Sequence, residues 1–123
     1  MTGVQTCALP ICIAALARDA RDAISLRDRP WLGSIVAESF RENKLIHPST
    51  TNADIDALVE ATKPYCRGMK LLGAGGGGFA LFISPDRRKA EELRSLLLRD
   101  FEDERARLVD FALNKKGLQV TVS

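Results

Sequence analysis

The sequence predicts an α+β domain in which helices pack on one face of a mainly antiparallel sheet. Three observations carry this prediction. The first half of the chain holds three amphipathic segments with helical spacing. Two short apolar segments then flank a glycine run at residues 73–78. A fourth helical segment follows, and the C-terminal residues alternate between apolar and polar side chains.

The composition fits one small globular domain. The chain has 123 residues, of which 46% are hydrophobic and 28% charged, and its net charge is +2. No apolar run approaches the ~20 residues of a membrane helix, and the interspersed charges do not indicate a nucleic-acid surface. Cys12 and Cys66 lack the spacing of metal ligands. We therefore expect both to be reduced thiols in a cytoplasmic protein.

Three helices are expected before residue 63. Pro30 separates the first two, and the loop at residues 47–52 offers capping side chains to the third, which ends by Pro64. Asp54 and Asp56 lie in its first turn, where the helix dipole favours negative charge, so we interpret them as dipole partners. His47 is expected to be exposed and not catalytic. The apolar faces consist of Ile13, Leu16, Ala17, Ala20 and Ile24 in the first helix, Leu32, Ile35, Val36 and Phe40 in the second, and Ile55, Leu58 and Val59 in the third.

The second half is predicted to begin with two strands on either side of the glycine run. The second strand, residues 79–83, is apolar throughout and is expected to be buried on both faces. Ser84 is the expected N-cap of the fourth helix, with Pro85 in its first position. Two more strands are predicted at residues 107–113 and 118–123, joined by turn residues 114–117. The order of helices and strands gives the sheet a ferredoxin-like character.

The glycine run is the strongest functional signal in the chain. A glycine held in regular structure costs about 0.5–1 kcal/mol relative to alanine, so four in succession indicate backbone that must approach something closely. Consecutive N–H groups without a Cβ can also turn toward one anion. A flexible linker is the alternative, but linkers are flanked by polar residues, and this run has apolar neighbours. The run is neither a Walker A loop nor a Rossmann fingerprint, because no Gly-Lys-Ser/Thr and no helix follows it.

The residues from Gly68 to Phe79 resemble the third signature of the GHMP sugar and mevalonate kinases, a Lys-x-x-Gly-Ala-Gly-x-Gly-Gly pattern. Segments 43–48, 50–52, 108–111 and 116–120 are similar to bacterial fucokinases of that superfamily. His47 departs from the pattern, because an acidic residue is expected there. The resemblance implies that part of an ATP and substrate cleft is formed by Lys70, Gly73, Ala74, Gly75, Gly76, Gly77 and Gly78. Lys70 either supplies charge at the cleft or points outward from its strand.

The resemblance also implies a parent enzyme. That parent would be an ATP- and Mg²⁺-dependent kinase that phosphorylates the anomeric hydroxyl of L-fucose or a related sugar. The phosphate loop and catalytic aspartate of the family have no counterpart in residues 12–123, so no catalytic residue or metal ligand is expected here. ATP and Mg²⁺ would be bound mainly by a missing N-terminal half, and this piece alone would be inactive. The alternatives are a heptose 7-phosphate kinase of the same superfamily, a freestanding α+β ligand-binding module and a purely structural interaction domain.

The N-terminus reads differently from the rest of the chain. Residues 2–11 match the translation of sequencing-adapter DNA, with codons ACT GGA GTT CAG ACG TGT GCT CTT CCG ATC. We therefore expect residues 1–11 to be an artefactual leader and residues 12–123 to be the C-terminal domain of the kinase.

Overall fold

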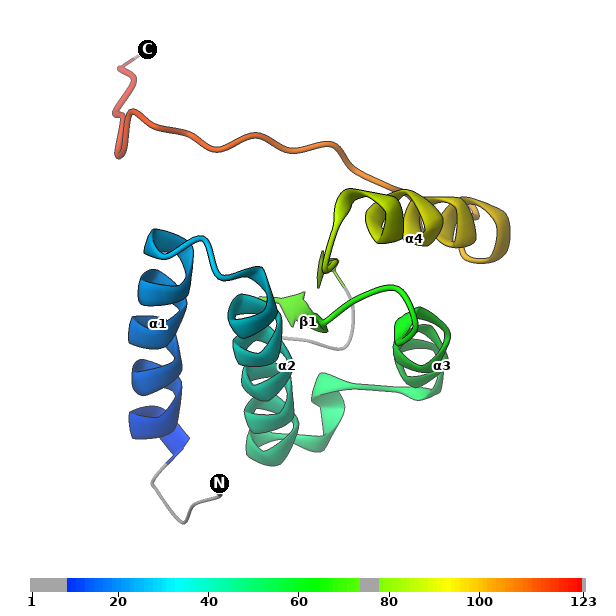
Figure 1. Ribbon diagram of the computed structural model, residues 1–123, viewed down its shortest axis with the longest axis horizontal. Helices are drawn as coiled ribbons and strands as arrows, with labels where there is room; N and C mark the ends of the chain where they lie inside the picture. The colour runs from blue at the N-terminus through cyan, green and yellow to red at the C-terminus, as the bar shows by residue number, and fades with distance from the viewer. Residues whose placement is uncertain (1–8, 74–77, 123) are drawn as a thin grey trace.

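A computed structural model describes residues 9–73 and 78–122, with side chains from Cys12 onward. Four α-helices and a two-stranded antiparallel sheet make it an α+β fold, which confirms the predicted class (Figure 1). The chain runs through α1 (Leu9–Ser25), α2 (Arg29–Ile46), the short 3₁₀ turn η1 (Pro48–Thr50), α3 (Ala53–Thr62), β1 (Gly68–Leu72), β2 (Phe79–Ile83) and α4 (Arg87–Asp100).

The first two helices form an antiparallel hairpin, with α1 lying beside α2 (Figure 1). The reversal between them uses Arg27, whose φ of 56° lies in the left-handed region. Asp28 then caps α2, because its carboxylate accepts the Trp31 N–H at 3.0 Å. Pro30 lies in the first turn of α2, where its missing N–H leaves no helical hydrogen bond unmade. The two predicted helices are confirmed.

The loop after α2 supplies caps, as its composition predicts. His47 Nδ1 accepts the Ser49 N–H at 3.1 Å and so begins η1. Asn52 Oδ1 accepts the Ile55 N–H at 3.0 Å and begins α3. The His47 side chain therefore has a local structural partner in a turn, and α3 starts and ends where the sequence indicates.

One face of the sheet carries the hydrophobic core. Because strand side chains alternate, Met69 and Leu71 of β1 point to the same side, and both are less than 10% exposed. Phe40 of α2 and Ile55 of α3 pack against these two side chains and complete the core. Burying a side chain of this size stabilises the fold by roughly 1.5–3 kcal/mol. The partly buried residues around this core are Leu58, Val59, Cys66, Ala80 and Phe82.

Strand β2 is less buried than its sequence predicts. It pairs with β1 from Leu72↔Phe79 to Gly68↔Ile83, but Phe79 is 63% exposed and the other four residues are half-buried. A two-stranded sheet has too few neighbours to enclose a strand on both faces. The expectation of complete burial was therefore wrong.

Helix α4 begins two residues later than expected. Asp86, not Ser84, is its N-cap, and the Asp86 carboxylate accepts the Lys89 N–H at 2.8 Å. Leu93 and Leu97 are the buried residues of α4. A carboxylate is a strong acceptor near the positive end of the helix dipole, which explains why the cap falls on Asp86.

The prediction of two C-terminal strands was wrong. Residues 107–122 contain no strand and run as an extended segment away from α4 (Figure 1). The Asp103 carboxylate accepts the N–H groups of Arg105 and Ala106 and turns the chain at this point. Phe111 is 78% and Leu118 93% exposed. Alternation alone does not make a strand, because each strand needs a neighbouring backbone to bond. Only the turn at residues 114–117 is present, with Lys116 N–H bonded to Asn114 Oδ1 at 2.9 Å.

The cysteines also differ from expectation. Cys12 is disulfide-bonded, so its assignment as a reduced thiol was wrong, whereas Cys66 is free. The expectation rested on the absence of metal-ligand spacing, which does not address disulfide bonding. No helix within the described ranges is long and apolar enough to cross a bilayer.

Candidate functional site

The glycine run lies at the turn of the β1–β2 hairpin. Gly73 follows β1 with a φ of 86°, and Gly78 precedes β2 with a φ of 84°. A Cβ on Gly73 would meet nothing within 4 Å, and one on Gly78 would meet Leu72 O at 3.7 Å. The backbone angle, and not lack of space, is therefore what favours glycine at both positions. Ala74, Gly75, Gly76 and Gly77 lie outside the described residues, so the cleft-lining role predicted for the run stays a prediction.

Lys70 lies in the middle of β1, and its side chain leaves the core face of the sheet. Its Nζ donates to Ser39 Oγ of α2 at 2.8 Å. Around it, a groove of about 290 Å³ runs between α1 and α2. The groove is mostly apolar and is lined, with Lys70 and Ser39, by Ile13, Leu16, Ala17, Ala20, Ile35 and Val36.

A second glycine pair holds the base of this hairpin, and the sequence analysis missed it. A Cβ on Gly68 would lie 2.0 Å from Gly33 O, and a Cβ on Gly33 would lie 2.3 Å from Arg67 Cβ. Helix α2 and strand β1 therefore touch backbone to backbone. An isolated glycine within a helical pattern is the signal that could have shown this contact.

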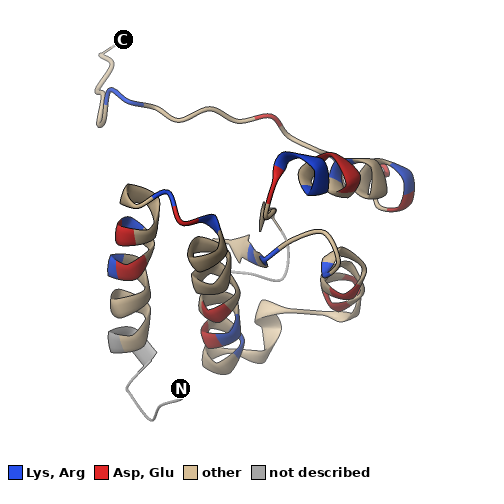
Figure 2. Cartoon of the chain, in the orientation of Figure 1, with Lys and Arg blue, Asp and Glu red and all other residues tan. Residues whose placement is uncertain are grey.

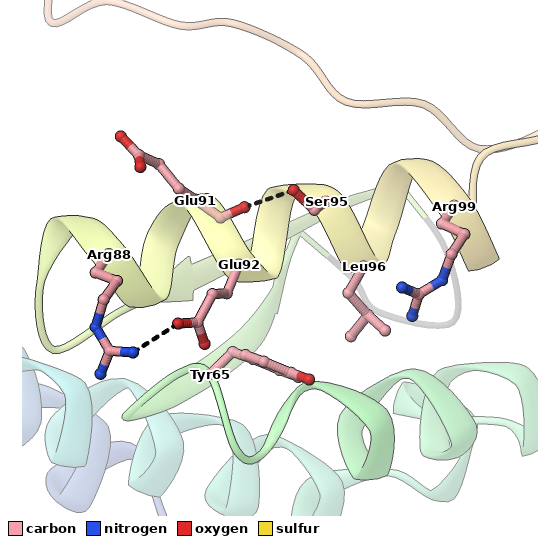
Figure 3. A pocket seen from close by; sticks show the side chains of 7 residues that line it. All are labelled: Tyr65, Arg88, Glu91, Glu92, Ser95, Leu96 and Arg99. Atoms are coloured by element: carbon pink, nitrogen blue, oxygen red, sulfur yellow. Dashed lines mark hydrogen bonds and ion pairs between the residues drawn. The ribbon is translucent and has the colours of Figure 1, made fainter.

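A polar hollow of about 510 Å³ lies between α4 and the loop before β1 (Figure 3). Tyr65 faces Arg88, Glu92 and Leu96 there. The cations of α4 are already paired: Arg88 with Glu92 at 2.9 Å and Arg99 with the adjacent Asp100 at 2.8 Å.

The same holds for the basic residues at the start of α4. Arg87 pairs with Glu91 at 2.9 Å, and Lys89 pairs with Glu92 at 3.0 Å and lies over the Tyr65 ring. Figure 2 shows basic and acidic residues side by side on this helix. Because these cations are paired with carboxylates of the same helix, we interpret the start of α4 as a solvated, ion-paired face and not as a phosphate site.

Metal-binding and nucleophilic groups are sparse in the described residues. Within residues 9–73 and 78–122, no group of three His, Cys, Asp or Glu side chains could hold a metal ion. The Cys66 thiol donates to Thr62 O at 3.3 Å, and burial raises its pKa. A thiol with a raised pKa is a poor nucleophile at neutral pH.

The fold and the hairpin define an α+β domain whose glycine turn joins two antiparallel strands. Two curated proteins are similar to it in sequence. The bifunctional fucokinase/GDP-fucose pyrophosphorylase of Arabidopsis thaliana is 39% identical over 85 residues, or 69% of this chain. The L-fucokinase/L-fucose-1-P guanylyltransferase of Bacteroides fragilis is 33% identical over 109 residues, or 89% of this chain. No protein-family model and no solved structure matches it significantly.

The chain is therefore related to part of the fucokinase-containing bifunctional enzymes. It spans 8% of the length of the Arabidopsis protein and 12% of that of the Bacteroides protein. This relationship links the chain to kinases that phosphorylate a carbohydrate.

Proposed function

We propose that this chain is the C-terminal domain of an ATP-dependent sugar kinase of the fucokinase type and GHMP superfamily. The parent would transfer the γ-phosphoryl group of ATP to the anomeric hydroxyl of L-fucose or a related sugar. One observation carries the proposal: two proteins with fucokinase in their names are similar to this chain over 69% and 89% of its length.

The part proposed for this domain is one wall of the substrate cleft. Gly73 follows β1 and Gly78 precedes β2, and both have backbone angles that glycine adopts readily. Four successive residues without a Cβ, 75–78, let another backbone or a phosphate approach their N–H groups closely. Phosphoryl transfer depends mainly on positioning and on donors directed at developing charge, which such a wall can supply. The glycine run and Lys70 are the residues assigned to this wall.

ATP and Mg²⁺ belong to the proposal through the kinase parent. The described residues offer no carboxylate cluster for a cation. We assign the donors for Mg²⁺ and most contacts to ATP to a preceding half of the polypeptide, as the resemblance to the GHMP kinases implies. Bound Mg²⁺ would neutralise phosphate charge during transfer. A cytoplasmic location fits an enzyme whose substrates are ATP and a free sugar.

The test starts from the source DNA. Sequencing upstream of the Cys12 codon should extend the reading frame into a serine- and glycine-rich phosphate loop. The intact protein is then expressed and assayed with L-fucose and ATP, with a heptose 7-phosphate as the competing acceptor. Residues 12–123 alone serve as the control.

We expect the intact protein to phosphorylate fucose and the isolated domain to be inactive. Preference for the heptose phosphate would transfer the proposal to that branch of the superfamily. A ribosome-binding site and start codon next to Cys12 would overturn the kinase proposal in favour of a freestanding domain. Turnover by residues 12–123 alone would contradict the assignment of catalysis to a preceding half.

A further inference from the structure

Lys70 is the charged residue nearest to the glycine run on β1, and its side chain points to helix α2. We propose that Lys70 is a positioning residue: through Ser39 it fastens the glycine hairpin to α2, and it does not touch ATP or sugar. The inference rests on the proposed function, because it specifies how one residue of the assigned cleft wall acts.

The direction of the Lys70 side chain carries the first step. Its neighbours Met69 and Leu71 face the core formed with Phe40 and Ile55. Strand alternation therefore places Lys70 on the opposite side, with Gly68 and Leu72. There its Nζ reaches Ser39 Oγ at 2.8 Å, in the groove between α1 and α2.

The surroundings of the ammonium group carry the second step. Six of the eight residues lining the groove are apolar, and Lys70 itself is half-buried. Within the described ranges, no carboxylate lies within ion-pair distance of Lys70 Nζ. A cation in such surroundings favours the geometry that keeps its hydrogen-bond acceptor. The Ser39 hydroxyl is therefore a specific tether between α2 and β1.

The third step is that α2 holds β1 at two nearby points. Gly68 is pressed against Gly33 O at the base of the hairpin, and Lys70 is bonded to Ser39 two residues later. Gly73 follows Lys70 by three residues, about 10 Å along a strand. A change in the orientation of β1 would therefore displace Gly73. Small displacements of this kind lower the rate of group transfer strongly.

A double-mutant cycle tests the inference. It is carried out on the intact protein, whose gene is obtained by sequencing upstream of the Cys12 codon. The variants are Lys70→Met, Ser39→Ala and the double substitution. Ser34→Ala is the matched control, because Ser34 lies on the same helix but its hydroxyl donates only to Pro30 O, at 3.0 Å. Lys70→Arg with wild-type Ser39 tests rescue. kcat, the KM for ATP and the KM for sugar are measured for each.

We expect Lys70→Met and Ser39→Ala each to lower kcat about tenfold, with KM nearly unchanged. The double variant should be no worse than either single variant, and Lys70→Arg should recover part of the rate. The melting temperature of Lys70→Met should not fall, because methionine fits an apolar groove. A purely structural role would lower stability without this loss of kcat.

Two results would overturn the inference. A Lys70→Met loss far larger than that of Ser39→Ala, with a raised KM for ATP, would place Lys70 in direct contact with substrate. Rates unchanged in both single variants would show that the tether is unnecessary.

Failure of the proposed function can be told apart from failure of this inference. If the wild-type protein phosphorylates no sugar, the proposed function fails, and the same cycle is read in the 123-residue chain by amide hydrogen exchange. There Ser39→Ala and Lys70→Met should each speed exchange in β1 and β2, and the double variant should add nothing. Independent, additive effects or no effect would overturn the tether.

Discussion

The peptide backbones of Gly33 and Gly68 touch: a Cβ added to Gly68 would lie 2.0 Å from the carbonyl oxygen of Gly33. Gly33 lies in the second turn of α2 and Gly68 begins β1, so the contact joins two segments far apart in sequence. Neither glycine has a positive φ angle. Space alone therefore requires glycine here, whereas backbone angle favours it at Gly73 and Gly78.

Replacement of Gly68 by alanine should destabilise the domain severely. The neighbouring atom is backbone, so the helix and strand must move apart, which costs about 3 kcal/mol or more. Urea unfolding followed by circular dichroism measures this loss. Gly73→Ala is the matched control, since it meets no atom within 4 Å and should cost only about 1 kcal/mol for its φ of 86°. Equal losses for both variants would contradict the close approach.

The N-cap of α4 can be tested at Asp86. Asp86→Ala removes the acceptor of the Lys89 N–H and should lower the free energy of unfolding by about 1 kcal/mol. Asp86→Asn keeps an acceptor and should lower the free energy of unfolding by only about 0.3 kcal/mol. Thermal unfolding of the two variants gives the comparison. If Ser84→Ala proved the more harmful change, the cap would lie where the sequence alone places it.

The thiol of Cys66 should react slowly. Burial raises its pKa, and its Sγ is partly covered and bonded to Thr62 O. A high pKa lowers the thiolate fraction at neutral pH, so alkylation should be slower than for a free peptide thiol and should accelerate as the pH rises. Mass spectrometry after timed iodoacetamide treatment measures the rate in the folded chain. The urea-unfolded chain is the control, and equal rates in both would refute the prediction.

The carboxyl of Glu38 should titrate below the usual range for glutamate. Arg41 Nε donates to its Oε2 at 3.0 Å, and this hydrogen bond lowers the Glu38 pKa. Since the pKa is lower in the folded state, the pair stabilises the fold above the unfolded pKa, and this contribution is lost as the pH falls through the folded pKa. Carbon-detected NMR titration measures the midpoint. Arg41→Ala should return it to the ordinary value, and an unchanged midpoint would contradict the assigned cause.

Deletion of residues 107–123 should leave the stability of the helices and hairpin nearly unchanged. Leu113, Leu118 and Val120 in this segment are each more than 80% exposed, so little burial is lost with them. Leu97→Ala is the contrasting change, because Leu97 is only 9% exposed and its loss should cost about 2–4 kcal/mol. Urea unfolding curves of the two variants give the free energies of unfolding to be compared. A large loss from the deletion would mean that the tail packs on the domain.

Local features of this fold were predictable because they depend on neighbours along the chain. Helical spacing gave α1, α2 and α3, and the capping role of Asn52 follows from its side chain alone. The two strands beside the glycine run are equally local, since only residues 73–78 separate them along the chain. The ends of the helices and strands were harder to predict, as the shift of the α4 N-cap from Ser84 to Asp86 illustrates.

The position of the glycine run between two strands was predictable from the sequence, whereas the direction of the Lys70 side chain was not. The glycine run marks the hairpin turn, but the sequence left Lys70 with two possible directions. Its hydrogen bond to Ser39 spans 31 positions along the chain. Such a contact depends on how α2 crosses β1, which no local pattern specifies.

The sequence by itself determined the α+β class, the four helices, and the two strands on either side of the glycine run. The spacing of apolar residues, the helix-capping side chains and the φ angles open to glycine all act over a few residues. Tertiary structure decided the rest. It set the contact of Gly33 with Gly68, the tether of Lys70 and the half-buried state of β2, and it left residues 107–122 without a neighbouring strand. Burial and strand pairing require a second surface, and only the folded chain determines which surfaces meet.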